Sequence, residues 1–425
     1  MANGDGNGKK SDAPTPTAKS SGPSDSHAVD DQQQVVSSIP DLYLHDDCYK
    51  LTHNMTMSKE QKEKLWKESV MPKIKEQSNV TLYKDVCQAT SRAVDVKLVA
   101  EMEKKNAETL AKLEKEIADA EQNLGETEFR NALQRKAEFQ CKSGDKEAAL
   151  STFRQTFEKT VGIGNRLDMT FQQIRMGLFF NDEKLTADSL EKAKSLIEQG
   201  GDWDRKNRLK AYEALYKMSI RDFTGAAYLF LDSVPTFDSP ELMSYEQLVF
   251  YTVVVSILAL DRPALRDKVM KGSEIQEQLT GGGKDKSLHL LKRYVQAFFE
   301  TEYDTFFTSL SELEPRLKYD RFFSPHYKYY VRAMRVKAYD QYLNPYKTVT
   351  ISNMANSFGV TESYIDRELP KLIASGLLHY RIDAVNGIIE TTFPDNKNNF
   401  YQSLISEGDA LGARIQRLAT LINDQ

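Results

Sequence analysis

Histidine and cysteine are the side chains best able to hold a transition metal, and histidine is also a frequent general base. The histidines are His27, His45, His53, His289, His326 and His379, and no two of them form an HxH or HExxH pair. In LHDDCYKLTH, His45, Cys48 and His53 stand close together, but their spacing fits no standard zinc motif and a fourth ligand is missing. We therefore expect no metal, no cofactor and no catalytic centre.

Two further patterns carry little chemistry of their own. The segment Thr280–Ser287, TGGGKDKS, lacks the earlier glycine and the Ser or Thr directly after the lysine that a phosphate-binding P-loop requires, so we expect a flexible loop. The three cysteines, Cys48, Cys87 and Cys141, are odd in number and scattered along the chain. This pattern is typical of free thiols in a reducing compartment.

Length and charge set the class of protein. A chain of 425 residues is long enough for two or three domains with a sizeable core. The apolar run Tyr251–Leu260 is about half of the roughly 20 residues that span a bilayer, so we expect a buried helix there and no membrane segment. The net charge of −5 gives no overall attraction for nucleic acid, which would need a local basic patch.

One segment, Lys318–Lys337, is rich in both basic and aromatic side chains and could form such a patch. Its basic residues are Lys318, Arg321, Lys328, Arg332, Arg335 and Lys337, opposed only by Asp320. Tyr330, Met334 and Ala338 recur at helical spacing, which is typical of a core-facing stripe. We favour a solvated basic face directed at an acidic partner over an RNA-binding surface.

The first part of the chain predicts a tail followed by helices. Residues 1–40 are dominated by Gly, Ser, Pro, Asp and Lys and should be disordered. In residues 41–125, a long helix places Leu110, Leu113 and Ile117 at heptad spacing and should end near Gly125. A free-standing coiled coil is one interpretation, and a helix lying on a neighbouring helical layer is the one we favour.

Residues 126–340 contain a repeat. The segments Ala137–Phe157 and Ala211–Val234 align at an offset of 77 residues, and each predicts a helix, a tight turn and a second helix. The matched pairs are Lys146 with Phe223, Ala149 with Ala226, and Phe153 with Phe230. The intervening segment, residues 184–201, is expected to be a degenerate hairpin of the same kind. These units resemble tetratricopeptide repeats, which stack into a solenoid; an irregular helical domain is the alternative.

Residues 341–395 predict a winged helix. A first helix buries Ile351, Met354, Ala355 and Phe358 and ends at Gly359, and a second, capped by Thr361, buries Ile365, Leu369, Leu372 and Ile373 and ends at Gly376. Leu378, Tyr380 and Ile382 then alternate as a strand, Asn386-Gly387 turns, and IIETTF returns as the partner strand. The wing is expected to have two strands with an open edge.

The second helix of this winged helix has the wrong chemistry for reading DNA. Base recognition needs Arg, Lys, Asn or Gln on its exposed face. Residues 361–375 instead carry Glu362, Asp366 and Glu368 against Arg367 and Lys371, a net charge of −1. Pro370 also removes a helix hydrogen bond and should kink the helix. We therefore do not expect nucleic acid as a partner.

The last segment, residues 396–425, predicts a strongly amphipathic helix. Its apolar stripe consists of Leu404, Leu411, Ile415, Leu418 and Ile422. Such a stripe must be covered, either by the helix packing back on its own domain or by bundling with helices of other subunits.

Several segments carry a resemblance to known proteins. They are GDWDRKNRLKAYEALY, LDRPALRDKV, FFSPHYKYYVRAMRVKAY, SFGVTESYIDRELPKLIASGLLHYRIDAVNGIIET and FPDNKNNFYQ. Over residues 80–425 the chain resembles the PCI-domain family of the proteasome lid, the signalosome and eukaryotic translation initiation factor three, and within it the non-ATPase lid subunits of the 26S proteasome. The first 40 residues and Pro370 depart from the family pattern.

The resemblance implies a fold that is mostly α: a right-handed, tetratricopeptide-like solenoid, whose PCI helical part begins near residue 225, followed by a winged helix and a C-terminal helix. It also implies a non-enzymatic scaffold in a hetero-oligomeric complex, with other lid PCI subunits and base subunits as partners, in cytoplasm and nucleus. The implied interfaces are a wing edge of His379, Tyr380, Arg381, Ile382, Ile388 and Ile389 within residues 379–391, and a helix bundle of Leu404, Leu411, Ile415, Leu418 and Ile422. A signalosome subunit that regulates cullin ligases, a nucleic-acid-binding regulator and a metal hydrolase are the alternatives.

Overall fold

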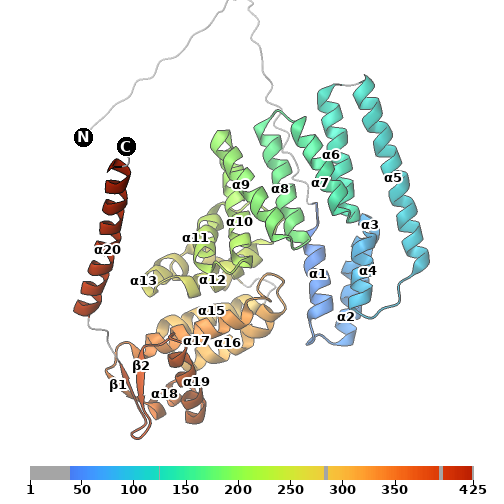
Figure 1. Cartoon of the computed structure of the whole chain (residues 1–425). Helices are drawn as coiled ribbons and strands as arrows, with labels where there is room; N and C mark the ends of the chain where they lie inside the picture. The colour runs from blue at the N-terminus through green and yellow to red at the C-terminus, as the bar shows by residue number, and fades with distance from the viewer. Residues whose placement is uncertain (1–38, 124, 282–285, 392–395, 424–425) are drawn as a thin grey trace, which may run out of the picture. The chain divides into compact units, whose positions relative to one another are not determined.

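The structure is a computed structural model that describes residues 39–123, 125–281, 286–391 and 396–423. The predicted disordered tail lies almost wholly outside these ranges, as do residues 282–285 of the glycine-rich segment Thr280–Ser287. The described chain is helical apart from one small sheet, which confirms the predicted fold class of helical repeats followed by a winged helix (Figure 1). Within the described ranges, no helix is both long and apolar enough to cross a membrane.

The first helices pack around a small core of their own. These helices are α1 (Leu42–His53), α2 (Lys59–Leu65), the π-helix η1 (Trp66–Val70), α3 (Met71–Gln77) and α4 (Val80–Ala89). Leu44, Cys48 and Leu51 of α1 are buried against Trp66, Val70 and Ile74. The long helix α5 (Val96–Asn123) lies on the next helix, α6, with Ala120 buried and Ile117 half-buried, so it is not a free-standing coil.

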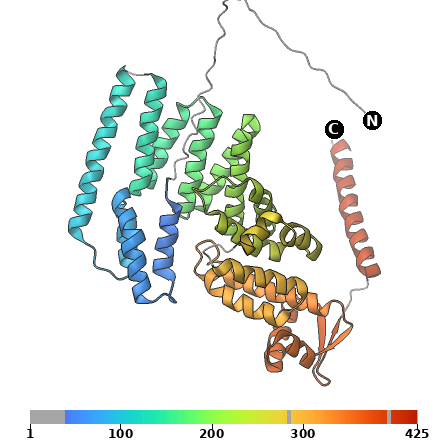
Figure 2. The ribbon, with the colours of Figure 1, turned by 180° about the vertical axis from the view of Figure 1, so that it is seen from behind.

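Three helical hairpins follow (Figure 2). They pair α6 (Glu126–Ser143) with α7 (Lys146–Glu158), α8 (Ile163–Phe179) with α9 (Glu183–Gly200), and α10 (Trp203–Ser219) with α11 (Phe223–Ser233). Ala149 and Ala226 are fully buried at equivalent places, as the repeat alignment predicted. The prediction for residues 184–201 is wrong in one respect: this segment is a single helix, α9, and its hairpin partner is α8.

The hairpin turns share a signature that explains where the second helices begin. Gly144, Asn181 and Arg221 each adopt positive φ, and each is followed by an aspartate. The side chains of Asp145, Asp182 and Asp222 accept a hydrogen bond from the backbone N–H three residues later, which caps α7, α9 and α11. At the α8–α9 crossing, a Cβ added to Gly177 would clash with Thr186, so only glycine allows this close approach.

The larger core continues through the next helices. They are the 3₁₀ turn η2 (Val234–Thr236), α12 (Tyr245–Ala259), α13 (Arg262–Leu265), the π-helix η3 (Arg266–Met270), α14 (Ser273–Thr280), α15 (Lys286–Glu300), α16 (Tyr303–Lys318) and α17 (Tyr327–Leu343). Every residue from Leu248 to Ile257 is buried, so the apolar run is a buried helix, as predicted. Tyr294, Phe306 and Tyr330 are also fully buried and join α15, α16 and α17 to this core.

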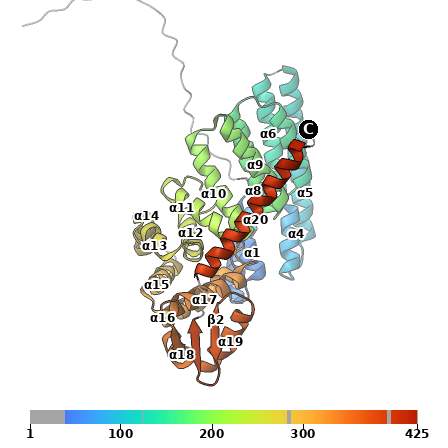
Figure 3. The same ribbon diagram turned by 60° about the vertical axis from the view of Figure 1, so that its left-hand side comes forward.

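The winged helix consists of β1 (Thr348–Thr350), α18 (Ile351–Phe358), α19 (Glu362–Ala374), β2 (Tyr380–Asp383) and β3 (Ile388–Thr391) (Figure 3). The helices bury six of the eight predicted side chains, whereas Ile351 and Ile373 are half-buried. Gly359 ends α18 in the left-handed conformation. The prediction of a two-stranded wing was wrong, because the sheet has a third strand, β1. The helix α19 continues through Pro370.

The chain closes with α20 (Asn396–Asn423), a helix of 28 residues. Residues 392–395, which join it to β3, lie outside the described residues, and so does the side chain of Ile422.

Candidate protein-interaction surfaces

The sheet of the winged helix has two free edges, and only one of them, β2, lies within the segment predicted to form the edge. Its strand order is β1-β3-β2, so β3 is hydrogen-bonded on both sides. Ile388 and Ile389 belong to this central strand and cannot offer their backbone to another chain, which corrects their placement at the wing edge. The unpaired backbone groups lie on β2 and on β1.

The hydrogen-bond pattern shows which groups of β2 face outward. Thr391 N donates to Lys347 O at 3.0 Å, so the odd-numbered residues of β3 turn their backbone groups toward β1. Glu390 and Ile388 therefore face β2, where their register partners are Arg381 and Asp383. The backbone N–H and C=O groups of Tyr380 and Ile382 are left pointing to the free side of the strand.

Side chains fix β2 against the rest of the winged helix. Tyr380 is buried, and its hydroxyl donates to Asp340 Oδ1 of α17 at 2.9 Å. Burial, reinforced by this carboxylate, raises the pKa of Tyr380, so the phenol stays protonated. His379 and Arg381 are exposed beside it. The strand thus has a rigid inner face and an accessible edge.

The exposed face of α19 is less acidic than its sequence indicates. Glu368 turns inward, where it accepts a hydrogen bond from the Tyr339 hydroxyl at 2.7 Å and forms an ion pair with Arg335 at 3.0 Å. The charges left outside are Glu362 and Asp366 against Arg367 and Lys371, which balance. The helix therefore presents a neutral face, not the positive one that DNA binding requires.

The basic-aromatic segment Lys318–Lys337 is largely used within the fold. Lys337 Nζ donates to the carbonyls of Ile257, Leu258 and Leu260, and so caps the C-terminal end of α12. Burial lowers the pKa of Lys337 to about 8. Arg321 is buried, and Arg335 is held by Glu368. The prediction of a solvated basic face is wrong for these three side chains.

The residues of LHDDCYKLTH point into different surroundings. His45 packs edge-on against Phe179, Cys48 lies in the core of the first helices, and His53 stacks on Tyr49. The described residues contain no group of three or more His, Cys, Asp or Glu side chains placed to hold a metal ion.

The helix α20 exposes its apolar stripe. Leu404, Leu411, Ile415 and Leu418 are 55%, 59%, 57% and 59% exposed. Together with Tyr401 they occupy five of the six a and d positions of three successive heptads, and Gly408 occupies the sixth. This is the pattern of a helix that packs against other helices. The two glycines Gly408 and Gly412 each weaken an isolated helix by about 1 kcal/mol relative to alanine. Helix propensity alone therefore stabilises α20 poorly.

Comparison with known proteins assigns the family. The sequence profile described as "26S proteasome subunit RPN7" matches residues 95–268, and the PCI-domain profile matches residues 308–393. A Caenorhabditis elegans protein named 26S proteasome non-ATPase regulatory subunit 6 is 49% identical over 93% of this chain and 97% of its own length. The chain belongs to the RPN7 family. An Arabidopsis thaliana homologue of that subunit is 41% identical over 91% of the chain and 98% of its own length. The Saccharomyces cerevisiae subunit RPN7 is 30% identical over 93% of the chain and 96% of its own length.

The RPN7-matched segment contains a buried polar network that sequence reasoning missed. Arg175 Nη1 donates to the Tyr212 hydroxyl at 2.7 Å, and that hydroxyl donates to Glu241 Oε1 at 2.9 Å. Arg175 Nε also donates to the carbonyl of Ile39, at the start of the described chain. Burial is the main cause of the raised pKa of Tyr212, which keeps its proton available for Glu241. The network ties Ile39, which lies just before α1, to α8 and α10.

Proposed function

We propose that this chain is a non-catalytic structural subunit of the 26S proteasome lid, where it scaffolds lid assembly and so supports ubiquitin-dependent protein degradation. Membership of the RPN7 family supports the assignment of this chain to the 26S proteasome, because the named relatives are 26S proteasome subunits. The observation that carries the scaffold role is the exposed apolar stripe of α20. The partners are the other PCI subunits of the lid and subunits of the base.

The stripe supports assembly for an energetic reason. Fully burying one Leu or Ile side chain is worth about 1.5–3 kcal/mol relative to leaving it exposed. Leu404, Leu411, Ile415 and Leu418 are each more than half exposed in the chain by itself. A bundle with helices of other subunits would recover this energy and would stabilise α20 at the same time.

The free edge of β2 supports a second contact, made side by side between winged helices. Strand addition to an exposed edge uses backbone hydrogen bonds for affinity and flanking side chains for specificity. The outward backbone groups of Tyr380 and Ile382 would supply the hydrogen bonds that give affinity. The exposed side chains of His379 and Arg381 would supply the specificity. We place the protein in the cytoplasm and the nucleus, and its free cysteines are compatible with a reducing compartment.

Affinity purification of the tagged chain followed by mass spectrometry tests this function. We expect co-purification of proteasomal lid subunits and of the ATPases of the base. Recovery of signalosome subunits and cullin ligases without proteasomal ATPases would contradict the proposal and support the alternative, which the relatives do not favour.

A further inference from the structure

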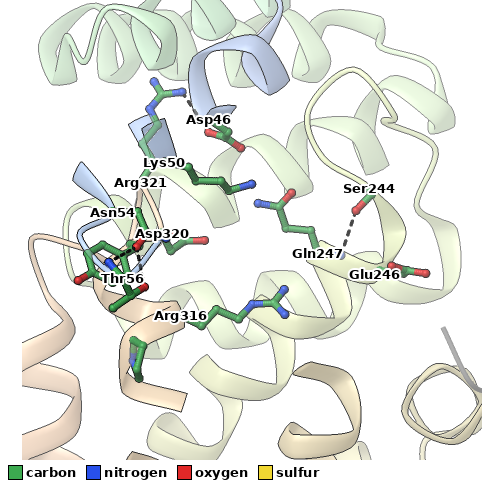
Figure 4. A pocket seen from close by; sticks show the side chains of 12 residues that line it. Asp46, Lys50, Asn54, Thr56, Ser244, Glu246, Gln247, Arg316, Asp320 and Arg321 are labelled. Carbon is green, nitrogen blue, oxygen red and sulfur yellow. Dashed lines mark hydrogen bonds and ion pairs between the residues drawn. The ribbon is translucent and has the colours of Figure 1, made fainter. Parts of the chain in front are cut away.

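A polar cavity of about 490 Å³ lies between α1, the start of α12 and the end of α16 (Figure 4). The charged side chains of its lining are three cations and three carboxylates: Lys50, Arg316, Arg321, Asp46, Glu246 and Asp320. This balance favours neither an anion nor a cation as a ligand. The described chain carries a reactive group elsewhere, in the turn between β2 and β3.

The wing turn, defined here as residues 383–387, contains an asparagine followed by a glycine. Asn386 is exposed, and Gly387 has a φ of 64°, in the left-handed region that favours glycine. An Asn-Gly pair can cyclise, because the backbone nitrogen of the glycine can attack the side-chain carbonyl carbon of the asparagine. A side chain on the second residue hinders this attack, and glycine has none.

The attacking nitrogen is not engaged by the fold. The Gly387 N–H donates no hydrogen bond to any described residue, whereas its carbonyl accepts one from the N–H of Ile351 at 2.9 Å. The space beside the Gly387 Cα is open, since a Cβ added there would meet no atom within 4 Å apart from the chain neighbours. The nucleophile is therefore accessible and free of hydrogen bonds within the described chain.

The side-chain amide that it would attack is held in place. Asn386 Nδ2 donates to Asp383 Oδ2 at 2.7 Å. Asp383 Oδ1 accepts from the backbone N–H groups of Val385 at 3.0 Å and Asn386 at 3.4 Å. These hydrogen bonds, the one from the Asn386 side chain above all, lower the pKa of Asp383, so its carboxylate is ionised at neutral pH. Cyclisation expels Nδ2, so the hydrogen bond from Nδ2 to Asp383 must break first.

We propose that Asn386 is a site of spontaneous deamidation and isoaspartate formation, and that Asp383 sets the rate by holding the asparagine amide. The Gly387 nitrogen bonds to Asn386 Cγ and gives up its proton, the Cγ–Nδ2 bond breaks, and Nδ2 leaves with that proton as ammonia. Water then opens the five-membered succinimide ring at either carbonyl, which gives aspartate or isoaspartate. Asp383 is a positioning residue and takes no part in the bond changes.

The test incubates the purified full chain in mildly alkaline buffer at physiological temperature. Peptide mapping by mass spectrometry, with fragmentation that separates isoaspartate from aspartate, follows residue 386. A synthetic peptide of residues 381–391 is the reference for the unfolded sequence. We expect the products in the folded chain to form about tenfold more slowly than in the peptide, because the charge-assisted hydrogen bond must break. No product at residue 386 in the folded wild type or its variants, while the peptide reacts, would overturn the site.

The variant Asp383→Asn separates the holding of the amide from the shaping of the turn. Its Oδ1 can still accept from the two backbone N–H groups, but its Nδ2 cannot accept a hydrogen bond from the Asn386 amide. We expect this variant to deamidate at residue 386 about tenfold faster than the wild type. The matched control is Asp366→Asn, which changes an exposed aspartate of α19 and should keep the wild-type rate. A wild-type rate in Asp383→Asn would overturn the role of Asp383.

Hydrogen exchange in β2 and β3 shows whether Asp383→Asn keeps the wing intact. Unchanged exchange together with faster deamidation supports the role of the amide contact, since a loosened turn would speed both. If exchange is faster in the variant, the wild type decides by itself. A folded wild type that deamidates as fast as the peptide would then overturn the role of Asp383.

The products would also change the wing. Either product places a second carboxylate beside Asp383, and isoaspartate adds a methylene group to the backbone between two paired strands. Asn386→Asp reproduces the added charge, so its amide hydrogen exchange in β2 and β3 should be faster than in the wild type. Unchanged exchange in Asn386→Asp would overturn this effect of the added charge.

Discussion

At the scale of single residues, His45 and Asp46 are neighbours on α1 whose pKa values shift for the same physical reason. Burial, with Arg321 nearby, lowers the pKa of His45 to about 3, so the folded protein keeps this imidazole neutral. Burial also raises the pKa of Asp46 to about 6, although Arg321 opposes that shift. In both side chains the interior penalises the charged form.

The first prediction concerns the pH dependence of stability. In the unfolded chain His45 takes up a proton near pH 6.5, whereas in the folded chain the imidazole stays neutral down to about pH 3. The stability that depends on neutral His45 is therefore fully present above pH 6.5 and is lost as the pH falls toward 3. Between pH 7 and pH 5, His45→Leu should therefore gain about 2 kcal/mol in unfolding free energy relative to the wild type. Urea unfolding of both proteins at the two pH values measures this gain.

The matched variant Asp46→Asn should behave oppositely. The folded-state pKa of Asp46 is raised, so the wild type takes up a proton and gains stability as the pH falls through about 6. Asp46→Asn should lose about 1 kcal/mol relative to the wild type over the same interval. Parallel pH profiles for the wild type and both variants would contradict the burial of these two side chains.

At the scale of elements, α20 exposes an apolar stripe and β2 exposes an unpaired strand edge, and both features favour contact with a partner. The helix has a stripe of apolar side chains at heptad spacing and two helix-weakening glycines. The strand has a free edge on a rigid support, because Tyr380 is anchored to Asp340. Each feature leads to a separate prediction.

The prediction for α20 is that Leu411→Asp combined with Leu418→Asp releases the chain from the assembled complex. The two charges would have to be buried in the helix bundle, which costs far more than the lost apolar contacts. Both side chains are exposed in the chain by itself, so the far-UV circular dichroism should remain helical. Co-purification with lid subunits measures the release.

The matched control for α20 is Ala413→Asp with Thr420→Asp, which places the same charges on the opposite side of the helix. This control should assemble normally. If the double Leu variant assembles as well as the control, the stripe is not an interface.

The prediction for β2 is that Ile382→Pro weakens association with the neighbouring winged helix. Proline removes the outward N–H of residue 382 while leaving the inner ladder intact, and proline is tolerated on edge strands for this reason. Ile382→Ala is the control, since it shortens the same half-buried side chain and keeps the N–H group. Equal loss of assembly in the two variants would show that the side chain matters and the backbone edge does not.

At the scale of the whole molecule, α1 takes part in two hydrophobic cores, one large and one small. Leu42 belongs to the core that runs from α8 to the winged helix, whereas Leu44, Cys48 and Leu51 belong to the core of the first helices. The hydroxyl of Tyr43 adds a hydrogen bond to the carbonyl of Pro240 at 2.7 Å. The helix therefore connects two cores that have separate packing.

This arrangement predicts that damage to one core stays local. Leu44→Ala leaves a cavity in the core of the first helices and should cost about 2–5 kcal/mol. Hydrogen exchange should become faster in α1 to α4 and stay unchanged in α12 and α17. Faster exchange throughout the chain would show instead that the two cores unfold as one unit.

The sequence by itself determined the helices, the repeat and the winged helix, because these depend on local periodicity and turn chemistry. From spacing alone, Ala149 and Ala226 match across 77 residues, and Ile365, Leu369 and Leu372 lie on one helical face; all five side chains are buried. The apolar stripe of α20 was likewise evident from its spacing. None of these features needs information about distant parts of the chain.

Only the tertiary structure decided what long-range contacts control. Thr348–Thr350 is too short to be recognised as a strand, and it becomes β1 because β3 pairs with it from about 40 residues away. Glu368 and Lys337 are charged and look exposed in the sequence, yet Tyr339 and the carbonyls at the end of α12 hold them inside. Asp46 likewise pairs with Arg321 although more than 270 positions separate them. A contact between residues so far apart depends on how the elements pack, which local spacing does not encode.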